Sequence, residues 1–484
     1  MFDIAPAITE VFLACAAMAL LMVGAFRGEE PGASRLVTPL AVMALVVGLF
    51  LLVTGVKAHA LTFGGHFITD GFAVFLKVMV LLGAALCLIM TPTFFRHEGI
   101  ERFEYPVLAL FSTVGMLMMI SANSLLALYL SLELQSFALY VMTAFHRDQT
   151  RSSEAGLKYF VLGALASGLL LYGCSLVYGF TGTLSFEELA RLFQPGAEGA
   201  LAISTGALIG LVFIAAGLAF KLAAVPFHMW TPDVYEGAPT PMTAFLAAAP
   251  KVAAMGLTLR LMYQPFGEWA GQWQQIVVFI SVASMLLGAF AAIGQTNIKR
   301  LLAYSSIGHM GYALVGFAAA TPDGVDSVLV YMAIYVTMTI GAFGCVLVMR
   351  RHGQALEEIR DLAGLRRTQP LLAAAMGIFM FSLAGIPPLA GFFAKLYVFI
   401  AAIEADLVPL AVIGVVTSVI GAYYYLYVIK VMYFDEAQEA FDRPIGRELA
   451  VIIGATAVFN FPLFVLYPSP LLIEAQRAAA ALLS

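Results

Sequence analysis

Six lysines lie inside long apolar runs, where a charged side chain needs a partner, water or a function. They are Lys77, Lys158, Lys221, Lys251, Lys395 and Lys430. A charge at the centre of a bilayer costs at least about 2.5–3.5 kcal/mol on insertion scales. Lys77 and Lys430 lie near the ends of their runs, so we expect their ammonium groups to reach the membrane interface. Lys158 lies about one turn inside its run, so both an interfacial and a functional role stay open for it.

Glu133, in SLLALYLSLELQSFALY, is the carboxylate that we place at mid-membrane. An unpaired buried glutamate becomes neutral, whereas one beside a lysine can stay ionised. We therefore predict that Glu133 pairs with Lys221, and that moving the carboxylate switches the lysine between its charged and neutral forms. A polar line along the membrane plane would continue through Lys251, His309 and Lys395. Buried ion pairs with a purely structural role are the alternative.

The stretch FKLAAVPFHMWTPDVYEGAPTP, residues 220–241, contains the Lys221 side chain and several helix-breaking residues. It belongs to an apolar segment, 202–238, that as one straight helix would be about 55 Å long, against a hydrocarbon core of about 30 Å. Pro226 removes a backbone donor, so the helix should break there. His228 lies in the broken stretch and could relay protons or cap the structure.

A second overlong segment covers residues 369–403 and contains SLAGIPPLAGFFAKLYVF. Pro387 and Pro388 precede Lys395 in this run, so a second break is expected beside a lysine. Backbone carbonyls that a break leaves free can solvate a charge that lipid cannot. Both breaks are therefore predicted to lie at functional positions.

The composition indicates an all-α polytopic membrane protein. Of 484 residues, 62% are hydrophobic and 11% are charged, against about 25% charged in soluble domains. About fourteen segments are long enough to span a bilayer, and without strict apolar/polar alternation they should be helices and not barrel strands. We place them at 6–26, 36–56, 72–94, 105–121, 123–145, 154–180, 202–238, 241–264, 274–295, 299–320, 325–350, 369–403, 408–433 and 447–471.

The remaining lysines and arginines orient the chain. Fifteen lie on one side of this map, and four lie on the other, namely Lys57, Arg191, Arg260 and Arg477. The positive-inside rule puts the first group in the cytoplasm and both termini outside. The N-terminus has no basic region, so the first apolar segment should stay as a membrane helix.

Charge and cysteine usage exclude several other classes. The net charge of −5, without a basic tail, argues against a nucleic-acid partner. The four cysteines lie in apolar runs without a C-x-x-C pair, so we expect no iron–sulfur cluster, zinc site or disulfide framework.

The two overlong segments occupy equivalent places in two blocks of five helices. They are helices 7 and 12, each the fourth of its block (helices 4–8 and 9–13), and an odd block length makes the two copies run in opposite directions. Inverted repeats with discontinuous helices are typical of transporters. This predicts four parts: an N-terminal three-helix segment at 1–104, repeats at 105–264 and 265–434, and a C-terminal helix at 435–484.

The sequence resembles the antiporter-like membrane subunits of respiratory complex I, the proton-translocating NADH:quinone oxidoreductase, a family that includes Mrp-type cation/proton antiporter subunits. The resemblance covers nearly the whole chain and is strongest in KLAAVPFHMWTPDVYEGAPTP and LLAYSSIGHMGY. The stretch LAGIPPLAGFFAK is similar to the N branch of the family, since the M branch tends to have a glutamate where Lys395 stands. The L branch carries a long C-terminal lateral helix.

This resemblance implies roles for individual residues. Glu133 would be the carboxylate partner and Lys221 the switched lysine on broken helix 7. Lys251 and His309 would relay protons, and Lys395 would be the terminal lysine towards the outlet. Accessory positions would be Lys158, near the cytoplasmic side, and His228.

The resemblance also implies partners. No cofactor is expected in this chain, while NAD(H), FMN, iron–sulfur clusters and quinone would belong to other subunits. The neighbours would be an M-type subunit, small subunits such as K, and the lipid bilayer.

Three other functions stay open. An Mrp-type Na⁺(K⁺)/H⁺ antiporter subunit would want additional carboxylates for a hard cation. An inert assembly subunit would need its buried charges only for stability. A nutrient transporter is the least favoured, because nothing suggests a pocket for an organic substrate.

Overall fold

The computed structural model describes residues 3–483 except 29–30, 56–58, 197–203 and 462–469. Its first half contains α1 (Ile8–Arg27), α2 (Pro31–Thr54), α3 (Gly71–Glu98), α4 (Glu104–Ile120), α5 (Leu125–Thr143), α6 (Thr150–Thr181), α7 (Phe186–Phe193), α8 (Thr205–Leu222), α9 (Thr231–Gly237), α10 (Thr240–Ala247) and α11 (Ala249–Tyr263). Its second half contains α12 (Ala270–Ile293), α13 (Ile298–Ala318), α14 (Pro322–Val348), α15 (Leu365–Thr368), α16 (Pro370–Ala384), α17 (Ala390–Glu404), α18 (Val408–Phe434), α19 (Arg447–Phe459) and α20 (Pro470–Leu483).

Two short antiparallel hairpins and four 3₁₀ turns complete the described residues. The hairpins pair β1 (Ala60–Thr62) with β2 (Phe67–Thr69) and β3 (Arg350–Arg351) with β4 (Gln354–Ala355). The 3₁₀ turns are η1 (Ala5–Ala7), η2 (Phe63–Gly65), η3 (Gly267–Trp269) and η4 (Ile359–Leu362).

The all-helical membrane fold predicted from composition is confirmed. Eleven helical segments in the described part of the chain are long and apolar enough to cross a bilayer, with α10 and α11 together forming one of them, and α4 and α16 are shorter apolar helices. Within the described residues, the predicted apolar segments overlap a helix or an interrupted pair of helices, and residues 462–469 of the last predicted segment lie outside those residues. Residues 435–484 hold two described helices, α19 and α20, where sequence reasoning expected one.

The helices that carry the predicted site begin at polar caps. Ser124 accepts a hydrogen bond from the Ala127 amide at the start of α5, and Ser204 accepts one from the Ala207 amide at the start of α8. Asn297 accepts from two amides in the first turn of α13. Such caps satisfy backbone donors that a helix N-terminus leaves free, so each sets the register of the helix after it.

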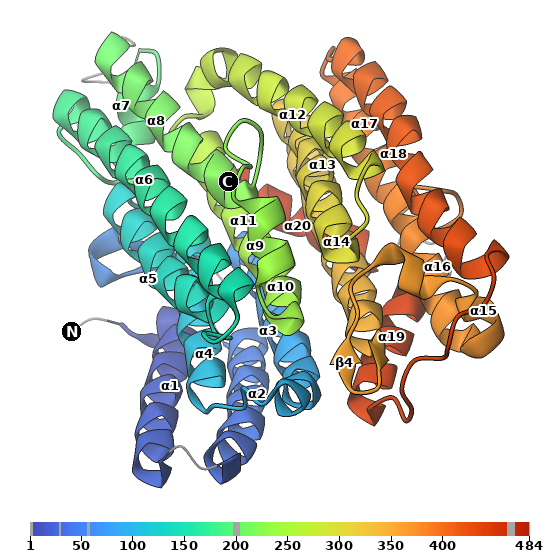
Figure 1. Cartoon of the computed structure of the whole chain (residues 1–484). Coiled ribbons are helices and arrows are strands. Elements are labelled where there is room, and N and C mark those ends of the chain that lie inside the picture. Colours follow the sequence, from blue (N-terminus) through green and yellow to red (C-terminus); the bar gives the residue numbers. More distant parts are fainter. Residues whose placement is uncertain (1–2, 29–30, 56–58, 197–203, 462–469, 484) are drawn as a thin grey trace.

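The centre of the molecule is formed by α11, α13 and α14. These helices lie between α5, α6 and α8 on one side and α16, α17 and α18 on the other (Figure 1). Helices α13 and α14 are apolar, and nearly every side chain in them is buried within the protein. A helix that is buried all round belongs to a protein core, so other helices separate these two from lipid.

The first predicted break is confirmed between α8 and α9. Helix α8 ends at Leu222, Ala223 adopts a left-handed conformation with φ 57°, and the next helix begins at Thr231. The Trp230 indole donates to the Phe220 carbonyl at 3.0 Å, and the same carbonyl accepts from the Ala223 amide at the end of α8. The break is therefore stabilised by hydrogen bonds of its own.

The second predicted break is confirmed between α16 and α17. Helix α16 ends at Ala384, Gly385 has φ 81°, and α17 begins at Ala390. A Cβ on Gly385 would lie 2.9 Å from the Lys395 side chain, so glycine is required here both by the backbone and by the lysine.

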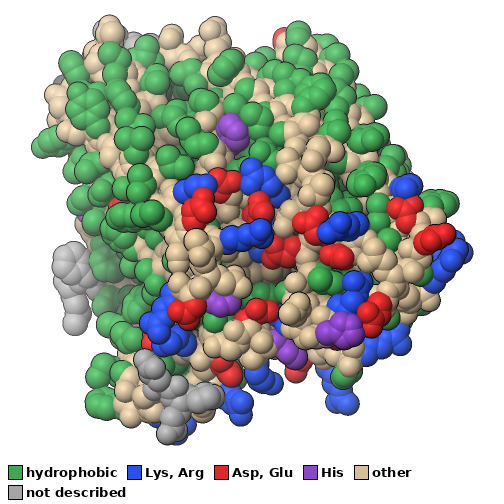
Figure 2. Space-filling view, in the orientation of Figure 1, with side chains coloured by type: hydrophobic (Ala, Val, Ile, Leu, Met, Phe, Trp, Pro, Cys, Tyr) green, Lys and Arg blue, Asp and Glu red, His purple; other side chains and the backbone are tan. Residues whose placement is uncertain are grey.

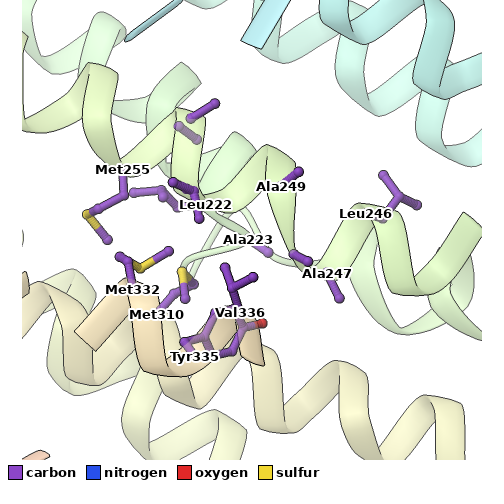
Figure 3. Close-up of a cluster of buried hydrophobic side chains, with 14 of the residues drawn as sticks. Leu222, Ala223, Leu246, Ala247, Ala249, Met255, Met310, Met332, Tyr335 and Val336 are labelled. Carbon is purple, nitrogen blue, oxygen red and sulfur yellow. The ribbon is translucent and has the colours of Figure 1, made fainter. Parts of the chain in front are cut away.

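A third interruption, which sequence reasoning missed, separates α10 from α11 at Ala248 (φ −105°, ψ −87°). The predicted segment 241–264 is thus two helices, and Lys251 lies in the first turn of the second one. Apolar side chains gather where these helices meet the end of α8 and helices α13 and α14 (Figure 3), among them Leu222, Met255, Met310 and Met332, all buried. This apolar packing keeps bulk water out of the centre.

Two buried ion pairs tie the N-terminal helices into the molecule. Lys77 on α3 pairs with Glu10 on α1 at 2.6 Å, and both side chains are buried. The interfacial position expected for Lys77 is therefore wrong, because a carboxylate from another helix takes the place of water. Lys430, in contrast, is 58% exposed and pairs with Asp435 near its helix end, as expected.

Arg260 on α11 is also buried, and it binds both carboxylate oxygens of Asp70, each at 2.9 Å. Its Nε donates to the Ile120 carbonyl at 3.0 Å. Sequence reasoning counted Arg260 among the basic residues on the outer side of the membrane, whereas the structure buries it in an ion pair. The guanidinium can be buried because each of its three nitrogens donates to an acceptor.

Apolar and charged side chains occupy different regions of the surface. On the face seen in Figure 2, hydrophobic side chains cover the upper part, and Lys, Arg, Asp and Glu gather over the middle and lower parts. Exposed large apolar residues occur on α2, α6 and α18, which suits helices that face lipid.

We expect Arg260→Met to destabilise the chain by about 3–5 kcal/mol, because it leaves the Asp70 carboxylate buried without its partner. The free energy of unfolding can be measured in mixed micelles with increasing SDS. Arg477→Met is the matched control, since the Arg477–Glu474 pair is exposed and should contribute at most about 1 kcal/mol. Equal losses in the two variants would contradict this assignment.

Candidate functional site

Lys221 lies one residue before the end of α8, and its ammonium points to α5. The Nζ atom donates to the Ser136 hydroxyl at 2.7 Å. The rings of Tyr140 and Phe220 flank the ammonium at 5.7 and 5.6 Å from their centroids. The charge is thus held by a neutral hydroxyl and two aromatic faces.

Glu133 lies one helical turn from Ser136 on α5. Its carboxylate acts on Lys221 electrostatically, but within the described residues the two groups form no ion pair at 4.0 Å or less. One carboxylate oxygen, Oε1, is buried and has no hydrogen-bond partner among those residues. The predicted Glu133–Lys221 pair is therefore not closed in this conformation, because Ser136 takes the ammonium.

Lys251 lies next to the same break from the other side. Its Nζ donates to the Leu222 carbonyl at 3.1 Å, which is the last carbonyl of α8. Lys251 and Lys221 thus lie around one helix end, with the backbone of Leu222 between them. This contact links the site on α8 to α11.

His309 lies in the middle of α13 among hydroxyl groups. Its Nδ1 is 2.6 Å from the Tyr331 hydroxyl, and its Nε2 is 3.2 Å from the Tyr425 hydroxyl. Tyr425 in turn hydrogen bonds to Ser305. The imidazole also has electrostatic interactions with both Lys395 and Lys251.

A small cavity lies beside these hydroxyls. Its volume is about 10 Å³, close to the lower limit for one water molecule, and its lining includes Ser305, Ser306 and Tyr335. Ser306 and Tyr335 are themselves hydrogen-bonded at 2.8 Å. The surroundings of His309 are therefore polar although they are buried.

Lys395 lies on α17 and reaches back to the second break. Its Nζ donates to the Leu383 and Ala384 carbonyls at 3.2 and 3.0 Å and to the Ser418 hydroxyl at 2.8 Å. The ammonium also lies 4.6 Å from the centroid of the Tyr312 ring, one turn along α13 from His309. Lys395 thus meets three hydrogen-bond acceptors, all of them neutral.

The central residues form one buried row. Lys221, Lys251, His309 and Lys395 are each between 1% and 7% exposed. Each lysine lies against the C-terminal end of a broken helix, where free carbonyls and the helix dipole favour a cation. Only neutral acceptors hydrogen bond to these three ammonium groups within the described residues.

Lys158 and His228 lie away from this row. Lys158 is 41% exposed and pairs with Glu154 and Asp233, each at 2.7 Å. Asp233 also binds Arg300, so Lys158 belongs to a surface cluster of charges. His228 is half-buried in the break, and no hydrogen bond of its ring to a row lysine is present in the described structure.

A polar cavity of about 830 Å³ opens on the side of the molecule that carries β3 and β4. Lys299 lies at its wall and donates to the Glu236 and Ala238 carbonyls and to the Glu357 carboxylate at 2.8–2.9 Å. Burial alone would raise the pKa of Glu357, but the Lys299 ammonium and hydrogen bonds from Lys299 and Asn297 hold that pKa below its usual value. Lys299 thereby joins α9 of one half to the β4–η4 loop of the other.

Sequence reasoning missed the neutral partners of the row, namely Ser136, Tyr331, Tyr425 and Ser418. Serine and tyrosine are common in membrane helices, so their types alone carry little signal. The structural pairs Glu10–Lys77 and Asp70–Arg260 could have been suspected, because each member is a charge inside or beside an apolar run.

Metal sites and disulfides are absent from the described part of the chain. No group of three or more His, Cys, Asp or Glu residues there is arranged to hold a metal ion. All four cysteines are free thiols, and three of them are buried.

Comparisons with known proteins place the chain in a family. A family described as "NADH:quinone oxidoreductase/Mrp antiporter, TM" matches residues 122–421. NADH-quinone oxidoreductase subunit N of Parvibaculum lavamentivorans is 58% identical, covering 99% of this chain and 97% of the relative.

Solved structures agree with this result. A chain of respiratory complex I from Thermus thermophilus is 32% identical, with a TM-score of 0.79 over 93% of this chain and 96% of that one. A chain of the Mrp complex from Dietzia sp. is 22% identical, with a TM-score of 0.87 over 99% of this chain and 98% of that one, which shows a shared fold. The chain therefore belongs to the NADH:quinone oxidoreductase/Mrp antiporter family, in the branch formed by the N subunits of NADH-quinone oxidoreductase.

Proposed function

We propose that this chain translocates protons as a membrane subunit of NADH-quinone oxidoreductase, and that the buried row is its proton path. One observation carries the assignment of the path: three lysines and a histidine follow one another through the centre, each held by neutral acceptors. A lysine without a carboxylate in hydrogen-bond contact can give up its proton more readily than one in a closed ion pair. Groups that exchange protons are needed wherever protons cross a membrane.

The roles follow the order of the row. Glu133 is proposed to control the charge on Lys221 at the first break. Lys251 and His309 then relay protons through the centre, and the hydroxyls of Tyr331 and Tyr425 extend the relay at His309. Lys395 is the terminal group at the second break. Lys158 and His228 are proposed only as accessory groups, since neither contacts the row.

The repeats, orientation and partners belong to the same proposal. We propose two inverted repeats at 105–264 and 265–434, after a three-helix segment at 1–104 and before a C-terminal segment at 435–484. We propose that the chain lies in the bacterial inner membrane, which its short loops suit, and the positive-inside rule supports both termini on the periplasmic side. We propose that it assembles with the other membrane subunits of complex I, including an M-type neighbour and small subunits such as K. NAD(H), FMN, iron–sulfur clusters and quinone would be bound by partner subunits.

The alternative is an Mrp-type antiporter subunit that exchanges Na⁺ or K⁺ for protons. It draws on the shared fold and on the description of the matching family, which covers both functions. Hard cations are bound by several oxygen ligands, often carboxylates. Glu133 is the carboxylate that acts on Lys221, while Glu10 and Asp70 are already paired with basic side chains. The row therefore favours protons over metal cations.

The assignment to complex I is tested by purifying the tagged chain from its native host after gentle solubilisation. We expect NADH:quinone oxidoreductase activity to co-purify with it, because the chain should be part of that complex. Co-purified material that lacks NADH oxidation but exchanges Na⁺ for H⁺ in vesicles would instead support the antiporter function.

Within the purified complex, we expect Lys221→Met to slow proton transfer through this chain about 10²-fold or more, the usual contribution of a proton-transfer group. Proton translocation should be measured in vesicles by quenching of a pH-sensitive dye, relative to NADH oxidised and to assembled complex. Lys430→Met is the control, because Lys430 is exposed and pairs with Asp435 outside the row. Normal translocation in Lys221→Met would refute the proposed path.

Tyr425→Phe should reduce proton translocation per NADH oxidised, but less than Lys221→Met does, because it removes one hydroxyl beside His309 and leaves Tyr331 in place. The matched control is Tyr263→Phe, whose hydroxyl donates to the Phe317 carbonyl away from the row. A similar loss in both variants would point to packing and not to proton relay.

A further inference from the structure

Two side chains that can accept a hydrogen bond from a lysine, Ser136 and Glu133, lie within one turn of α5 near Lys221, and they differ in charge. Ser136 receives its hydrogen bond at 2.7 Å. Glu133 lies three residues earlier on the same helix, and residues at this spacing share a face with about 5–6 Å between their Cβ atoms. A lysine side chain has a flexible four-carbon stem, so a change of rotamer can carry its ammonium between such neighbours.

The hydroxyl of Ser136 can act towards Lys221 only as an acceptor. Its own proton is donated to the Leu132 carbonyl, one turn earlier in α5. The oxygen lone pairs therefore remain for the ammonium. Because α5 fixes both partners, the serine presents a defined, neutral position for the Lys221 charge.

Glu133 offers the second position. Its Oε1 atom is buried and accepts no hydrogen bond from the described residues, although a buried carboxylate oxygen without a partner is costly. The Coulomb attraction therefore draws Lys221 towards Glu133, while Ser136 holds it away. Glu133 acts electrostatically on Lys221, whereas no carboxylate in the described part of the chain acts in this way on Lys251 or Lys395, so the choice is particular to Lys221.

We infer that Ser136 is a positioning residue that holds the Lys221 ammonium apart from Glu133, and that proton translocation requires Lys221 to alternate between these two acceptors. The inference rests on the proposed function, since it adds a residue to the same path. Without Ser136 the open position disappears, and Lys221 stays in the ion pair with Glu133.

The test uses the purified complex in vesicles with three single variants: Ser136→Ala, Ser136→Thr and Ser131→Ala. Ser136→Ala removes the acceptor, which should shift the balance about tenfold or more towards Glu133, as expected for losing a hydrogen bond to a charged group. Proton translocation per NADH oxidised should fall accordingly. Ser136→Thr keeps a hydroxyl at the same carbon and should restore the wild-type ratio of protons translocated to NADH oxidised.

Ser131→Ala is the matched control. Ser131 is a buried serine of the same helix, and its hydroxyl donates to the Ala127 and Leu128 carbonyls without contacting a lysine. Its ratio of protons to NADH should equal that of the wild type. If Ser136→Ala does not assemble, Ser136→Cys takes its place, because a thiol has a similar volume but is a weak acceptor.

The outcomes separate this inference from the proposed function. If Ser136→Ala translocates normally while Lys221→Met fails, the positioning role is wrong and the path stands. If Ser136→Ala and Ser136→Thr fail alike, the serine acts through packing, and the inference is overturned. If the Lys221→Met variant translocates protons normally, the proposed proton path is refuted, and the positioning role of Ser136 is refuted with it.

Discussion

The hydrogen bonds between buried ammonium groups and the carbonyl ends of broken helices are the interactions on which this structure depends. A continuous membrane helix uses nearly all its carbonyls internally and can offer none to a charge. The ends of α8 and α16 free the carbonyls of Leu222, Leu383 and Ala384, and these accept from Lys251 and Lys395. The same helix ends carry partial negative charge, which further favours a cation. Each break thus creates the polar surroundings that its lysine needs.

The buried charges of the molecule divide into two kinds by the partners they meet. Lys77 and Arg260 bind carboxylates at 2.6 and 2.9 Å, and such closed pairs hold helices together. The lysines of the row meet carbonyls, hydroxyls and aromatic rings. A closed ion pair keeps its proton, whereas a neutral environment lets the ammonium exchange it. The type of partner therefore separates structural charges from those suited to proton transfer, although all are equally buried.

Packing around the row is as important as the row itself. Helices α13 and α14 are buried on all sides, and apolar side chains fill the junction at the end of α8. This apolar surrounding prevents bulk water from joining the two sides of the membrane. Protons are then restricted to the sites that the breaks and hydroxyls provide, while the polar cavity at Lys299 reaches α9 and α13 from one side.

The sequence by itself determined the membrane class, the positions of most of the long apolar helices, the two main breaks and the lysines beside them. These features are local: apolar run length, proline and glycine are read within a few turns of one segment. The tertiary structure decided the partners, because Ser136 and Lys221 are 85 residues apart, and His309 and Tyr425 are 116 apart. It also decided that Lys77 and Arg260 are buried in ion pairs and that Lys221 faces Ser136 in place of Glu133. Such contacts depend on how helices pack against each other, and no local pattern in the chain encodes them.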